Sequence, residues 1–248
     1  MTLRLGAGVL LVALTALTTL TAASPARAGV DITPPEVGSC HDLTYDEFLA
    51  QTEPEPAVAC SDWHNAVTVG VVEFDTAPDW SDAGAVFKEA TTPCLTAMVD
   101  GLGGTARTVS RSAFVLTTYA PTEAQRNAGA AWIRCDVVLH AADELLKLSP
   151  RGLPVLASLP LEDKFARCRQ HRRLDYVLNN CLRYHHWRAT ESIRISTDGW
   201  PGYNAARRIA LRKCRGRMPD EFLFEWPRSR QSWRAGFRDA ICFAKTRS

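Results

Sequence analysis

The sequence of 248 residues lacks the short motifs that mark common catalytic centres. It contains no Gly-x-Ser-x-Gly, no His-Glu-x-x-His and no glycine-rich loop that could hold a phosphate. It also has no Cys-x-x-Cys pair, although structural zinc sites usually present such close pairs. These absences disfavour the familiar hydrolases, metalloproteases and nucleotide-binding enzymes. We therefore expect no catalytic residue, no cofactor and no metal.

Long apolar runs are missing after the first residues of the chain. Arg4 precedes an apolar run over residues 5–23, and Ala26-Arg27-Ala28 fits the cleavage site of an export signal. This pattern predicts a signal peptide over residues 1–28 and cleavage after Ala28. The alternative is an uncleaved membrane anchor, because the run is nearly long enough to span a bilayer. Either way, we expect an extracytoplasmic protein that is secreted or attached to the cell envelope.

Cysteine is plentiful, and all eight residues lie beyond the predicted signal, four in each half of the chain. An even count in an oxidising compartment favours disulfides. The alternative is a zinc site formed by Cys181 with His185 and His186. Four cysteines allow three connectivities in each half. We predict that the first pairs with the second and the third with the fourth, which gives Cys40–Cys60, Cys94–Cys135, Cys168–Cys181 and Cys214–Cys242.

One pattern of spacings occurs twice in the chain, which indicates two tandem copies of one domain over residues 29–148 and 149–248. The matched positions are Cys60 and His64 with Cys181 and His185, Trp80 and Cys94 with Trp200 and Cys214, and Gly129 and Cys135 with Gly236 and Cys242. We interpret the two histidines as structural, hydrogen-bonded in the loop beside a disulfide. The two tryptophans are typical core anchors, because large aromatic side chains dominate small cores.

This repeated frame resembles the septum formation domain of actinobacterial envelope proteins. The first copy carries the resemblance in Val37-Gly38-Ser39-Cys40 and Trp132-Ile133-Arg134-Cys135, and the second in the segment 233–238 that leads to Cys242. Two departures are that Cys168 lacks the Val-Gly lead-in and that Arg126 stands where the second copy has Trp233. The resemblance implies an extracytoplasmic role at the division septum and supplies no catalytic residue.

Each half reads as a small α+β unit, with one helix packed on a short, mostly antiparallel sheet and stapled by disulfides. In the first half the pattern predicts strands over 66–74, 112–119 and 130–140, a helix over about 82–102, and helical tendency at 143–148. In the second half it predicts strands over 191–196, 221–226 and 237–245 and a helix over 204–218. Residues 149–152 read as the linker.

The near-neutral total charge conceals opposite signs in the two halves. Residues 29–148 hold six Lys/Arg and eighteen Asp/Glu, a net charge of −12, whereas residues 149–248 hold twenty-one and nine, a net charge of +12. This split favours either an anionic partner or contact between the two domains. On the second helix, Arg208, Arg212 and Arg215 fall opposite the apolar face, so we predict a solvent-facing stripe that binds anions. The alternative is that the three arginines only form a solvated helix face and bind no partner. A second basic cluster comprises Arg167, Arg169, Arg172 and Arg173.

Two classes of function follow from these patterns. The first is a non-catalytic envelope protein that binds an anionic cell-wall polymer, a membrane surface or an acidic envelope protein. The second is a secreted cell-wall hydrolase with unidentified carboxylates, since no spacing, including that of Glu53 and Glu55, marks a glycosidase pair. Nucleic acid is disfavoured as a partner because the chain is expected to be exported.

Overall fold

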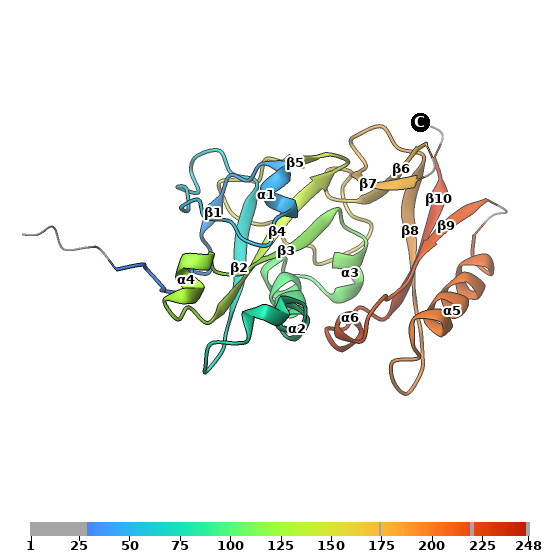
Figure 1. Cartoon of the computed structure of the whole chain (residues 1–248). Helices are drawn as coiled ribbons and strands as arrows, with labels where there is room; N and C mark the ends of the chain where they lie inside the picture. The colour runs from blue at the N-terminus through green and yellow to red at the C-terminus, as the bar shows by residue number, and fades with distance from the viewer. Residues whose placement is uncertain (1–28, 174, 219–220, 247–248) are drawn as a thin grey trace, which may run out of the picture.

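The computed structural model describes residues 29–173, 175–218 and 221–246, which form two antiparallel sheets of five strands, each with one long helix against it (Figure 1). The first half contains β1 (Cys40–His41), α1 (Tyr45–Leu49), β2 (Ala66–Glu73), η1 (Trp80–Asp82), α2 (Ala83–Gly101), α3 (Ala106–Ser110), β3 (Phe114–Tyr119), α4 (Glu123–Asn127), β4 (Trp132–Ala141) and β5 (Glu144–Leu146). The second half contains β6 (Arg167–Arg172), β7 (Asp175–Asn180), β8 (Trp187–Arg194), α5 (Tyr203–Arg215), β9 (Phe222–Glu225), α6 (Arg230–Arg234) and β10 (Asp239–Lys245).

The two sheets share one strand order. The first runs β1-β2-β4-β3 and the second runs β6-β8-β10-β9, with β5 added beside β4 and β7 added beside β6. The long helix follows the second strand of this order in both halves, because α2 comes after β2 and α5 comes after β8. The expected α+β class, with small disulfide-stapled units, is confirmed.

The two long helices bury the ridges that their sequence periodicity predicts. In α2 the buried side chains are Val86, Ala90, Cys94 and Met98, four residues apart, and in α5 they are Ala206, Ala210 and Cys214. A spacing of four residues keeps side chains on one helix face, so each ridge faces its sheet. The second helix ends at Arg215, three residues before the predicted end.

The segment at 143–148 differs from its predicted helical tendency. Glu144–Leu146 is strand β5, which pairs antiparallel with the end of β4, so that Leu139 faces Leu146. The chain reverses at Ala142 and Asp143, and Ala142 has a φ of 59°. Pairing with the end of β4, beyond the residues that pair with β2, outweighs the weak local preference of these polar residues for a helix. The β6–β7 hairpin was not predicted, because charged and amide side chains dominate its sequence.

The two halves share one part of their hydrophobic core. Leu102 and Phe114 from the first half lie in the same buried cluster as Leu156, Leu161 and Cys168 from the second. Backbone hydrogen bonds also cross, as where Ala113 N donates to Phe165 O at 2.8 Å. The sheets are therefore joined through apolar packing and main-chain bonds. The boundary between two tandem domains at residues 148 and 149 stays a prediction.

Candidate functional site

The four disulfides are those predicted from the sequence, and each lies within one half of the chain. Cys40–Cys60 and Cys168–Cys181 tie β1 and β6 to nearby loops, whereas Cys94–Cys135 and Cys214–Cys242 join a long helix to its sheet. The Cα–Cα distances of 5.2 to 5.4 Å are ordinary for disulfides. No described cysteine is free. Disulfides of this number indicate an oxidising, extracytoplasmic location.

Each repeated histidine forms the same bond in its loop. His64 Nδ1 donates to Asp62 O at 3.1 Å, and His185 Nδ1 donates to Arg183 O at 2.8 Å. A carbonyl oxygen only accepts, so the proton sits on Nδ1 in both rings. His64 is fully buried and His185 is half-buried. Both rings therefore hydrogen-bond within their own loop, four residues after a disulfide cysteine.

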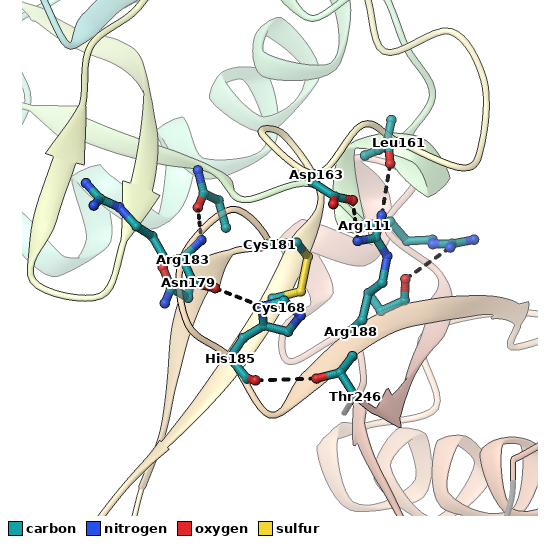
Figure 2. The surroundings of a disulfide bond; sticks show 12 residues. Arg111, Leu161, Asp163, Cys168, Asn179, Cys181, Arg183, His185, Arg188 and Thr246 are labelled. Carbon is teal, nitrogen blue, oxygen red and sulfur yellow. Dashed lines mark hydrogen bonds and ion pairs between the residues drawn. A yellow bond between two sulfur atoms is a disulfide. The ribbon is translucent and has the colours of Figure 1, made fainter. Parts of the chain in front are cut away.

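The sulfurs of Cys168 and Cys181 and a ring nitrogen of His185 lie within 4.8 Å of one another, which is the arrangement of three metal ligands. Figure 2 shows the disulfide between Cys168 on β6 and Cys181 on the loop that follows β7, with His185 on the same loop. Metals bind thiolates, and a disulfide sulfur carries no such charge. His186, the other ligand considered for zinc, is engaged elsewhere, because its Nδ1 accepts the backbone N–H of His171 at 3.0 Å.

The tryptophans of the repeat pack in equivalent ways against different partners. Trp80 packs on the core of the first half and Trp200 on that of the second. The Arg126 guanidinium carbon lies 5.7 Å from the centre of the Trp80 ring, and the Trp233 ring lies 5.7 Å from that of Trp200. A cation–π contact in one half thus replaces an aromatic pair in the other.

The repeated glycines also adopt one conformation. Gly129 has a φ of 101° and Gly236 a φ of 91°, in the region that only glycine enters without strain. Each lies shortly after a short helix, α4 or α6, and shortly before the strand that carries the last cysteine of its half. The spacing that identified both glycines therefore has a backbone reason in each half.

The predicted arginine stripe lies on the exposed face of α5. Arg208, Arg212 and Arg215 are all exposed, and none forms an ion pair with any residue that the structure describes. The helix contains no Asp or Glu. Arg212 and Arg215 lie in its last turn, where cations stabilise the helix dipole, but Arg208 lies further from that end.

Contact between the acidic and basic halves involves other charged residues. Arg172 lies 3.4 Å from Asp143 and Arg183 lies 2.7 Å from Glu144, both on the surface. In the opposite sense, Arg107 of the first half lies 2.9 Å from the buried Asp239 of the second. Surface ion pairs contribute at most about 1 kcal/mol each. None of the described ion pairs between the halves thus involves the arginine stripe on α5.

A buried ionic network in the first half was not predicted. Arg134 on β4 donates to Asp136 at 2.9 Å and to Glu53 at 2.8 Å, and both carboxylates are almost fully buried. Thr68 donates to the other oxygen of Asp136 at 2.8 Å. His41 Nδ1 lies 3.6 Å from Glu53. An alternation of buried and exposed residues along β4 could not identify this cluster, because all ten residues of that strand are buried.

Burial governs the pKa values in this network. Desolvation raises the pKa of Asp136, and the adjacent Arg134 opposes that rise. Desolvation together with Arg134 lowers the pKa of His41 to about 4. His41 is therefore neutral at physiological pH. No substrate can reach carboxylates enclosed in this way, so the network reads as a support for the sheet.

The chain matches no protein-family model, no curated protein and no solved structure. Within residues 29–173, 175–218 and 221–246, none of the helices combines the length and the apolar character needed to cross a bilayer.

Proposed function

We propose that this protein is a non-catalytic, exported binding protein of the cell envelope, which attaches to an anionic wall polymer through Arg208, Arg212 and Arg215. The observation that carries the proposal is that the stripe on α5 is exposed and has no acidic partner within the described chain. Along the helix axis, the three arginines span about 10 Å at 1.5 Å per residue. A polymer with repeated phosphate or carboxylate groups can contact them together, and arginine suits such groups because its guanidinium binds them in a bidentate manner.

The surroundings of the stripe favour a polymer over a lipid surface. A helix that lies in a membrane interface needs an exposed apolar face beside its cations. The apolar face of α5 is buried against β9 and β10, and Tyr203 is the only large hydrophobic residue described on this helix that is exposed. An anionic polymer requires no apolar insertion.

The alternative of a cell-wall hydrolase receives less support from the carboxylates. Glu53, whose spacing from Glu55 marks no glycosidase pair, is bound to Arg134 and enclosed. A hydrolase needs carboxyl groups that reach the bond being cleaved. Dye release from purified, dyed cell wall tests this alternative, and release above a heat-inactivated control would favour the enzyme.

The proposal also includes export of the protein and a location at the division septum. The Ala26-Arg27-Ala28 site lies outside the described residues, and we propose that cleavage after Ala28 releases the mature chain. N-terminal sequencing of exported protein should begin at Gly29, whereas an intact start at Met1 or Thr2 would indicate an anchor. The resemblance to septum formation domains adds the septum as the place of action. A fluorescent fusion that spreads evenly over the envelope would contradict that location.

The binding test compares two variants that lose the same charge. The first is R208Q/R212Q/R215Q, and glutamine keeps the helix because its propensity is close to that of arginine. The control is R151Q/R230Q/R234Q, whose arginines are also exposed and form no described ion pair. The probes are linear polyphosphate, purified cell wall and phosphatidylglycerol vesicles.

We expect the wild-type protein to bind polyphosphate and cell wall at low salt and to lose affinity as salt rises, because exposed charges are screened. At about 1 kcal/mol for each arginine, the value for a cation at an anionic membrane surface, the stripe variant should bind roughly 100-fold more weakly, since 1.4 kcal/mol is a factor of ten. The control variant should lose much less. Absence of binding to every probe at low salt would refute the proposal. Tighter binding to vesicles than to polymer would replace the polymer with a membrane.

A further inference from the structure

A cavity of about 630 Å³ lies between the two halves of the molecule. Its walls come from α2, α3 and β3 of the first half and from β6, β9, β10 and α6 of the second, and α6 lies beside α2 in Figure 1. Sites for small molecules commonly have volumes of about 300–1,000 Å³ and lie between domains. The size and position of this cavity are therefore those of a ligand site.

One end of the cavity carries an excess of positive charge. Glu225 on β9 is contacted by Arg169, whose Nε donates to it at 2.7 Å, and by Arg167, whose Nε lies 3.3 Å from its other oxygen. That Nε is buried and forms no hydrogen bond with a described partner, since the ion pair lacks hydrogen-bond geometry. Arg228 lines the same end, with its guanidinium carbon 4.9 Å from the centre of the Trp226 ring. Three cations thus face one carboxylate.

The second acid in the lining does not neutralise this excess. Asp239 is occupied by Arg107 at 2.9 Å and by Arg194 at 3.6 Å. Arg228 forms no ion pair with any residue in the described part of the chain, and its side chain is exposed. Guanidinium groups bind carboxylates and phosphates in a bidentate manner. The charged end of the cavity is therefore prepared for an acidic group of a ligand.

Much of the remaining lining is an apolar wall. It is formed by Met98, Val109, Phe114, Leu116, Phe237 and Ile241. Four of these residues are at least 95% buried, and three of them, Met98, Val109 and Phe114, belong to the shared core. Such a wall gains free energy by removing apolar ligand surface from water. A ligand that fills the cavity needs an apolar body as well as its acidic group.

We propose that this cavity binds a small amphipathic anion, an apolar chain or ring that ends in one carboxylate or phosphate. Arg228 holds the acidic group, the charges of Arg167 and Arg169 add to the attraction, and the apolar wall holds the body. This inference goes beyond the proposed attachment to wall polymer and does not depend on it, because the stripe on α5 contributes no residue to the cavity.

The test uses the full mature chain and titration calorimetry at concentrations below micelle formation. The probes are decanoate and decyl phosphate, with decanol and decyltrimethylammonium as neutral and cationic analogues. We expect each anion to bind at least tenfold more tightly than either analogue. The tighter of the two anions identifies the acidic group.

The variant R228Q should weaken binding of the anions at least tenfold, and its fold should be preserved because Arg228 is exposed. The matched control is R230Q, which removes the same charge two residues away and lies outside the lining. R208Q/R212Q/R215Q should bind the anions as the wild-type protein does, so failure of polymer binding and failure of this site are distinguishable. Equal binding of decanol and decanoate, or equal effects of R228Q and R230Q, would overturn the proposal.

Discussion

Replacement of Arg134 by methionine is the most direct test of the buried network in the first half. This arginine is the shared partner of Glu53 and Asp136, whose side chains are 1% and 0% exposed. Methionine fills much of the same volume but leaves two buried carboxylates without their cation. Breaking a buried ion pair by removing one partner costs about 3–5 kcal/mol, because an uncompensated charge remains in a low dielectric. The free energy of unfolding should fall by that amount near neutral pH.

The matched control is R172M, which breaks the surface pair between Arg172 and Asp143. Those side chains are 45% and 74% exposed, so water replaces the lost partner. The expected cost is below about 1 kcal/mol. R134K should lie between wild type and R134M, because lysine keeps the charge but cannot contact two carboxylates with one planar group. The measurement is urea unfolding with all disulfides intact, which reports the free energy through the midpoint and slope.

The pH dependence separates the ionic explanation from lost packing. Arg134 also lies 4.7 Å from the centre of the Tyr119 ring, and that contact does not depend on pH in this range. Without Arg134, only the hydrogen bond from Thr68 still opposes the rise in the pKa of Asp136 that burial causes. A folded-state pKa above the unfolded value means that the folded state gains protons, so the deficit of R134M should shrink as pH falls from 7 to 4. A cost equal to that of R172M, or a deficit that is constant with pH, would refute the reasoning.

Three further predictions concern other parts of the structure. The pKa of His41 is about 4 in the folded state and 6.5 in the unfolded state, so between these values the unfolded state binds one more proton. Stability should therefore fall as pH drops from 6.5 to 4, with a slope of up to about 1.4 kcal/mol per pH unit. Urea midpoints of H41Q should lack that part of the slope. C94A/C135A opens a loop of sequence separation 41, which in the loop-entropy treatment costs about 4 kcal/mol; calorimetry that finds no loss would count against this pair as a staple. G129A and G236A place a Cβ at a φ of 101° and 91° and should each cost about 1–2 kcal/mol; loss at one site alone would show that the backbone roles differ.

The periodic and covalent features of this protein could be predicted from the sequence. Ridges four residues apart identified the buried faces of both long helices, because helix geometry places such residues on one side. The even count and the repeated spacings led to the predicted disulfides, with the first cysteine of each half paired with the second and the third with the fourth. The same helix geometry predicted that Arg208, Arg212 and Arg215 would face solvent. These features depend on residues close in sequence or on a repeat that the chain displays twice.

The ionic network and the cavity were decided only by the tertiary structure. Arg134 and Glu53 are 81 residues apart, and Glu225 lies 56 residues from Arg169. No local pattern marks such partners, because a lone Glu or Arg in sequence is most often a solvated surface residue. The strand pairing at Glu144–Leu146 was missed for the same reason, since its partner edge exists only after β4 has formed. Side chains acquire these environments when distant strands and both halves pack together, and burial then changes their charge and chemistry.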